Sequence, residues 1–209
     1  GEKEYYGLIS RLTATPSDHK VQLFDMGVDF EETSEFDIFA LMCRYLEVED
    51  SKILFGDLNF SNLKLVQNNN TGEIMLYNYE QDFIIDKIIY ELIVEYLRKI
   101  NGFEKNIEVA GNKFTKQILI DEARRLQDQN KNKPYKSMLI PLISAMTNCS
   151  EFKYNHSTVW DLPIYVFMDS VKRIQKIKNY NYLMQGAYTG NIDIKKINKD
   201  ELNWLGELK

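Results

Sequence analysis

The sequence predicts an α+β fold that is predominantly α, with a small antiparallel β unit near the N-terminus followed by a helical, bundle-like region. Three observations predict it: alternating β-rich residues at 5–14, a turn-rich loop between two β-rich segments, and helical spacing of apolar residues over most of the remaining chain. The 209 residues are 44% hydrophobic and 27% charged, an ordinary composition for a folded soluble protein. We expect a small α+β unit over residues 1–80 and a helical region with a docking C-terminal tail over residues 81–209, as two parts or as one continuous domain.

The β prediction rests on three segments. Residues 5–14 alternate in polarity and are rich in β-forming side chains, so they are expected to form a strand. Residues 52–55 are expected to form a second, short strand. The strongest signal is an antiparallel hairpin near residues 62–78, because its loop, residues 68–72, consists of Asn, Thr and Gly, and both Asn and Gly tolerate a positive φ.

Helical spacing of apolar residues predicts the other elements. Pro16 is placed to start a short helix that Gly27 ends. Asp82 is expected to open the central core helix, whose apolar face is broader than a single seam. The predicted helices lie near residues 34–46, 82–101, 114–130, 136–147 and 159–178, with a short helical piece near 180–187. The residues expected to be buried in them are Ile88, Leu92, Ile143, Trp160 and Phe167.

Charge and apolar run length argue against two classes of partner. The net charge of -5 argues against a nucleic-acid partner, since phosphate binding requires a basic face. The longest apolar runs are far shorter than the roughly 20 residues that span a bilayer, so no membrane partner is expected. Cys43 lies in an apolar helical run and is expected to be a small buried hydrophobe, and Cys149 lies at a helix end. We therefore expect a soluble protein of a reducing cytoplasm.

The sequence offers no constellation for catalysis. Its two histidines, His19 and His156, are far apart and lack partners at the spacing of a metal site or a general base. Asp57 and Asn59 suggest a calcium loop, but the twelfth position, which requires Glu, is Asn68. We expect no enzymatic activity, no cofactor and no bound metal.

The C-terminal quarter points to contact rather than chemistry. Residues 158–178 read as one long, aromatic-rich amphipathic helix with a basic stripe in its last turns, where the helix dipole favours cations. Solvation of a helix face is the simpler explanation of that stripe, and phosphate contact is the alternative. A tryptophan in such a segment belongs either to the core or to a contact surface. The candidate interaction residues are Trp160, Lys172, Arg173, Lys176 and Trp204.

The tail that follows, residues 187–204, is too short to form a core and too apolar to stay free in water. We expect it to dock with Trp204 as its anchor, because burying an indole gains more than burying any other side chain there. It is expected to pack either on residues 159–178 of its own chain or on a neighbour's copy of that helix, which would mediate self-association or partner binding.

A group of short segments at both ends of the chain has a shared style and spacing, and the middle of the chain is less clear. These segments are residues 12–18, 23–29, 132–137, 143–148, 152–155, 159–160, 170–175, 195–198 and 203–204. Through them the chain resembles a family of bacteriophage virion and tail-assembly proteins from phages of low-GC bacteria.

The resemblance implies a non-enzymatic role, as a tail assembly chaperone or a virion structural adaptor. The implied partner is a phage structural protein such as the tape measure protein, or a second copy of the chain in a homo-oligomer. The implied location is the host cytoplasm, with or without incorporation in the virion. The alternative is a phage-encoded inhibitor that binds a host protein, which a small, acidic chain also fits. No site residues are implied by the resemblance.

Overall fold

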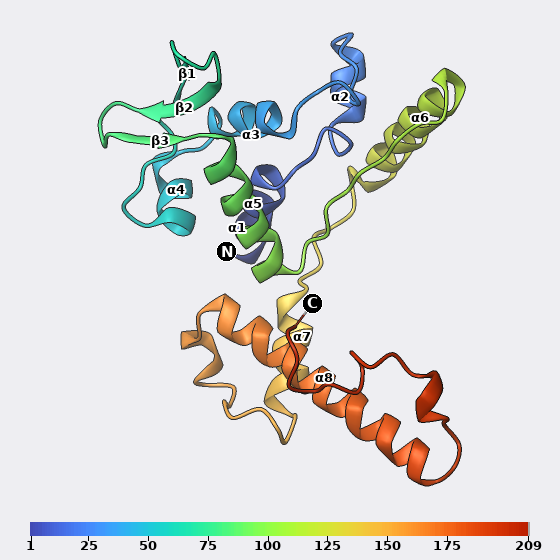
Figure 1. Cartoon of the computed structure of the whole chain (residues 1–209). Helices are drawn as coiled ribbons and strands as arrows, with labels where there is room; N and C mark the ends of the chain where they lie inside the picture. Colours follow the sequence, from blue (N-terminus) through green and yellow to red (C-terminus); the bar gives the residue numbers. More distant parts are fainter. Residues whose placement is uncertain (209) are drawn as a thin grey trace. The chain divides into compact units, whose positions relative to one another are not determined.

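The computed structural model describes residues 1–208 (Figure 1), which form two compact units. Unit 1 comprises residues 1–136, and unit 2 begins at Ser137. Helices dominate both units, and the one sheet of the described residues has three antiparallel strands, which confirms the α+β class. The sheet lies in the middle of the chain, at residues 64–85, and not near the N-terminus as predicted.

Unit 1 combines the sheet with six helices. The strands are paired in the order β1-β2-β3. Its elements are the helices α1 (Glu2–Leu12), α2 (Lys20–Asp25), α3 (Glu35–Cys43), α4 (Val48–Phe55), α5 (Lys87–Asn101) and α6 (Lys113–Asn130) and the strands β1 (Lys64–Gln67), β2 (Ile74–Asn78) and β3 (Phe83–Ile85).

The two strands predicted at residues 5–14 and 52–55 are wrong, because residues 5–12 lie in the helix α1 and residues 52–55 in the helix α4. In α1 the buried side chains of Leu8, Ile9 and Leu12 recur at helical spacing. Burial of this face in the core outweighs the β propensity of the tyrosine and isoleucine residues, because β propensity depends strongly on context.

The predicted hairpin is confirmed. Strands β1 and β2 pair from Lys64 opposite Tyr77 to Gln67 opposite Ile74. Within the loop, the Asn68 side-chain carbonyl accepts the N–H of Asn70 at 2.9 Å, and Gly72 has a φ of 74°. The local turn chemistry therefore fixes the hairpin as the sequence indicates.

The start of the next predicted helix is corrected by the third strand. Residues 83–85 form β3, which pairs with β2 through Leu76 opposite Ile85. Helix α5 begins only after Asp86, whose carboxylate accepts the N–H of Ile89 at 2.8 Å as an N-cap. The boundary expected between two parts of the chain, at residues 80–81, falls between the paired strands β2 and β3. It therefore lies inside unit 1.

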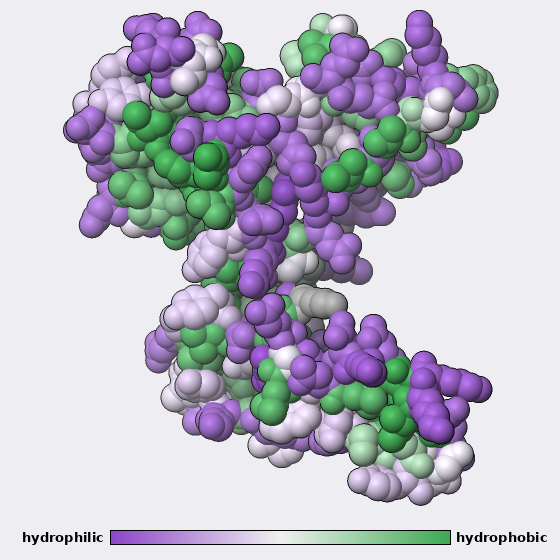
Figure 2. All heavy atoms as spheres, in the orientation of Figure 1, coloured by the Kyte–Doolittle hydropathy of each residue, from purple (hydrophilic) through white to green (hydrophobic). Residues whose placement is uncertain are grey.

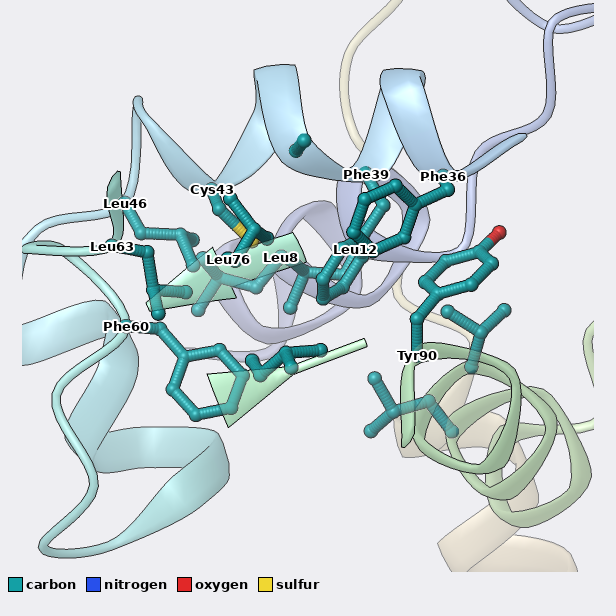
Figure 3. Close-up of a cluster of buried hydrophobic side chains, with 14 of the residues drawn as sticks. Leu8, Leu12, Phe36, Phe39, Cys43, Leu46, Phe60, Leu63, Leu76 and Tyr90 are labelled. Carbon is teal, nitrogen blue, oxygen red and sulfur yellow. The ribbon is translucent and has the colours of Figure 1, made fainter. Parts of the chain in front are cut away.

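The main core of unit 1 lies between α1, α3, α5 and the sheet (Figure 3). Leu8 and Leu12 of α1 meet Phe39 of α3, and Tyr90 of α5 packs edge-on against Phe36 at 5.5 Å between ring centroids. Cys43 is free and buried here, and burial raises the pKa of its thiol to about 12.

Helix α5 buries a different face from the predicted one. Ile88 and Leu92 were expected in the core, but they are exposed, and Tyr90, Val94 and Leu97 are buried instead. At its end, Asn101 donates its side-chain amide to the Leu97 carbonyl at 2.9 Å. Gly102 follows in the left-handed conformation, and its N–H donates to the Arg98 carbonyl.

Helices α2 and α6 pack together around a second apolar cluster of unit 1. Ile120 of α6 is fully buried against Val21 and Leu23. The predicted helices near 114–130 and 34–46 are confirmed by α6 and α3.

Unit 2 is built on one long helix. Its elements are α7 (Leu139–Thr147), the short 3-10 turn η1 (Val159–Asp161), α8 (Ile164–Tyr188) and the 3-10 turn η2 (Ile194–Lys196). Pro163 stands before α8, so this helix begins later than predicted and then runs without a break through residues 180–187. Ile143 and Phe167 are buried in its core as predicted, but Trp160 is exposed. No helix within residues 1–208 is long and apolar enough to cross a membrane.

Candidate interaction surfaces

Four of the five candidate residues lie where the C-terminal tail runs back along α8 (Figure 1). The Arg173 guanidinium donates to the carbonyl of Trp204 at 2.7 Å and to that of Gly206 at 3.0 Å. Lys176 donates its ammonium group to the Glu207 carbonyl at 2.8 Å. The tail is therefore docked on its own helix through its backbone, while the Trp204 indole remains 39% exposed.

A groove of about 820 Å³ separates α8 from the docked tail. Lys172 and Lys176 line its helix side, and Glu201 and Glu207 line its tail side. Within residues 1–208, the side-chain ammonium group of Lys172 has no hydrogen bond or ion pair. The two walls carry opposite charges, so the groove as a whole has no strong preference for an ion of either sign.

Trp160 lines a different groove in unit 2, of about 420 Å³, between α7 and the segment that leads into η1. Its indole is 59% exposed and packs edge-on against the His156 ring at 5.8 Å between centroids. Ile140 of α7, which is 60% exposed, lies in the same lining. This surface can take an apolar side chain of another molecule, because it joins an exposed indole and an aliphatic side chain around a hollow.

Unit 1 has an apolar surface that the sequence did not identify. Ile88, Leu92 and Tyr96 are 68%, 63% and 61% exposed, and we call these three residues the α5 stripe. Figure 2 shows hydrophobic side chains gathered on this unit around α4 and the start of α5. The signal that could have revealed the stripe is the breadth of the apolar face of α5, since the core covers only one side of such a helix.

The second cysteine belongs to a small polar cluster that ties the end of α7 to α8. The Cys149 thiol donates to the Glu151 carboxylate at 2.9 Å, and Lys178 donates to the Cys149 sulfur at 3.2 Å. The hydrogen bonds from Cys149 and Ser150 lower the pKa of Glu151 to about 2. This cluster fixes a turn by hydrogen bonds and leaves its carboxylate charged at neutral pH.

The two histidines lie in different units. His19, in unit 1, is part-buried, and this burial lowers its pKa. His156 lies on the surface beside Trp160. Within the described part of the chain, no group of three or more His, Cys, Asp or Glu side chains is arranged to hold a metal ion.

The C-terminal part of the chain is similar to a known protein family. Residues 130–209 match the family model of the YomV second domain, a phage-associated family. The match begins at residue 130, where α6 ends, and takes in all of unit 2, which begins at Ser137. This match supports the resemblance to bacteriophage proteins for this part of the chain. No curated protein and no solved structure matches the chain.

Proposed function

We propose that the protein is a non-enzymatic bacteriophage morphogenesis factor, a tail assembly chaperone or a virion structural adaptor, that acts through protein–protein contacts. The proposal is supported by the phage-associated domain in unit 2 and by the groove at Trp160 on that domain. An exposed tryptophan beside a hollow is the kind of residue that anchors a protein interface.

We propose that the partner is a phage structural protein, such as the tape measure protein, and that an exposed apolar side chain of this partner is what the protein recognises. Trp160 and Ile140 would receive such a side chain in the groove between them. His156 and Asn148, at the border of the groove, would remain in contact with water and form the polar rim that protein interfaces usually have.

Affinity purification of the tagged full chain from infected cells tests this proposal. We expect a phage structural protein to co-purify with the wild type and to be lost with Trp160→Ala, because a central tryptophan often contributes about 2 kcal/mol or more to binding. Tyr188→Ala is the matched control, since Tyr188 is an exposed aromatic residue of the same unit that does not line the groove.

The identity of the captured protein separates the two functions. A host protein that depends on Trp160 would support the alternative, an inhibitor of a host factor, and would contradict a morphogenesis role. Capture of the same proteins by the wild type and by Trp160→Ala would show that this groove is not the binding surface.

A further inference from the structure

The α5 stripe lies on the exposed face of α5, and the opposite face of this helix packs into the core of unit 1. Its three residues are spaced by four, so they follow one another along one line of the helix surface. Large exposed apolar patches on folded proteins usually mark contact surfaces. The charged residues beside the α5 stripe indicate which molecule covers it.

Charged residues border one side of the stripe in a definite order. Lys87, Glu91 and Glu95 each directly precede one residue of the stripe, and Lys99 follows Glu95 at the same spacing of four. All four side chains are exposed, and none of them has an ion-pair partner within residues 1–208. A groove of about 480 Å³ lies beside this flank, between α5 and the start of α3. The flank therefore presents unpaired charges in the order positive, negative, negative, positive next to an apolar line.

We infer that α5 is the contact between two copies of this chain, packed antiparallel around a twofold axis that passes between Ile88 and Leu92. Ile88 of each copy then meets Leu92 of the other. Such an axis brings the same flank of both helices to the same side of the contact. With a rise of about 1.5 Å per residue, Lys87 lies about 3 Å along the axis from both Glu91 and Glu95 of the second copy.

The charges select this register over its neighbours. In it, each lysine at position 87 approaches two carboxylates, and these four approaches outweigh the single approach between the two copies of Glu91. If the axis passed through Leu92, Lys87 would lie as close to Lys99 of the second copy as to Glu95, and Glu91 would face Glu95. An axis between Leu92 and Tyr96 would place Lys87 next to Lys99 alone. The charge order is palindromic, so an axis through Tyr96 would give Lys99 the same two carboxylates. That register places Ile88 opposite position 104, beyond the end of α5 at Asn101, and loses its apolar contact. The charges and the stripe together therefore select the register with the axis between Ile88 and Leu92.

This self-association does not rest on the proposed function, because it needs no phage or host component. A contact through one helix pair is at the small end of protein interfaces, so the dimer is weak and depends on concentration. Sedimentation velocity of the purified full chain from about 1 µM to about 1 mM covers the affinities expected of such a contact. We expect a monomer–dimer equilibrium for the wild type.

Charge reversal tests the register. Lys87→Glu weakens dimerisation by on the order of tenfold, as does the pair Glu91→Lys with Glu95→Lys, because each change places like charges together. The three changes combined restore the wild-type dissociation constant to within about threefold, because they restore opposite charges. This restoration also excludes a folding defect as the cause of the loss.

Two further variants complete the experiment. Leu92→Glu abolishes the dimer and leaves the helical circular-dichroism signal unchanged, since Leu92 lies outside the core. Lys99→Glu, the matched control on the same flank, leaves the dissociation constant unchanged in the inferred register. It would strengthen the dimer if the axis passed through Leu92 and weaken it if the axis passed through Tyr96. A wild-type chain that stays monomeric at all concentrations, a Leu92→Glu chain that dimerises normally, or a triple variant that does not recover would each overturn the inference.

Discussion

Gly186 of α8 packs directly against the Ile192 side chain of the tail, which would overlap any side chain at position 186. A Cβ atom on Gly186 would lie 2.8 Å from Cγ1 of Ile192 and nearer still to its Cδ1. The Gly186 carbonyl also accepts the N–H groups of Asn191 at 2.9 Å and of Ile192 at 3.1 Å. The missing side chain and the carbonyl together fix the point at which the tail turns back toward α8.

Gly186→Ala is therefore expected to release the tail. In an ordinary helix position this change stabilises a protein by about 0.5–1 kcal/mol, but here the new methyl group displaces Ile192. Hydrogen exchange and limited proteolysis should show lost protection after Tyr188 with α8 intact. Gly7→Ala in α1 is the matched control, because nothing lies within 4 Å of its Cβ position and the change should stabilise unit 1. Unchanged protection of the tail would show that Ile192 does not hold it.

Arg173 should hold the other end of the tail. Arg173→Ala removes two hydrogen bonds to tail carbonyls, whereas Lys172→Ala removes none. In a Trp160→Phe background, the fluorescence of Trp204 reports on the tail alone. We expect its emission to shift to longer wavelength with Arg173→Ala and to stay unchanged with Lys172→Ala. Equal spectra for the two variants would contradict this assignment of the anchor.

Two leucines of α5 give a direct measure of which face is the core. Leu97 is buried, so Leu97→Ala should lower the free energy of unfolding by about 2–5 kcal/mol. Leu92 is exposed, so Leu92→Ala should change it by no more than about 0.5 kcal/mol. Urea denaturation at a low protein concentration, where the chain is monomeric, checks both values. Similar losses for the two variants would mean that α5 is buried on both sides.

The charge of Glu151 should make unit 2 sensitive to acid. Hydrogen bonds from Cys149 and Ser150 lower the pKa of Glu151 from its ordinary 4.5 to about 2 in the folded state. A depressed carboxyl pKa stabilises the fold above the unfolded value, and that contribution is lost as the pH falls from about 4.5 to about 2. We expect a carboxyl signal of Glu151 that titrates near the lower value by NMR. Cys149→Ser keeps a donor and should preserve the shift, whereas Cys149→Ala should bring the pKa closer to 4.5.

Sequence reasoning succeeded where a short segment determines its own structure. The loop from Asn68 to Gly72 sets the hairpin through its own hydrogen bonds, and Gly102 ends α5 through its φ. It failed where packing decides. Whether Leu92 or Leu97 faces the core depends on α1 and α3, which are distant in sequence, and the helical state of α1 depends on the same core.

For the candidate interaction residues, sequence reasoning predicted that the tail docks but not which groups hold it. The tail was expected to dock on residues 159–178 of its own chain or of a neighbour's, and in the structure it lies on its own chain, where Arg173 donates to the Trp204 carbonyl and Lys176 to the Glu207 carbonyl. The anchor differs, because cationic side chains hold the backbone of the tail and the indole does not make these contacts. Burial of Trp160 could not be judged from its spacing, since Pro163 delays the start of α8 and leaves Trp160 in a separate turn.

The end of α5 also affects how fast the chain deamidates. Asn101-Gly102 is the dipeptide in which asparagine ordinarily loses its side-chain amide fastest, by attack of the glycine nitrogen on the side-chain carbonyl carbon. In the folded chain that nitrogen donates to the Arg98 carbonyl, and the amide it would attack is held on Leu97. Deamidation at this position should therefore follow unfolding, and mass spectrometry of peptides from heated and unheated samples would show it. Folding here protects the covalent structure of the chain as well as its shape.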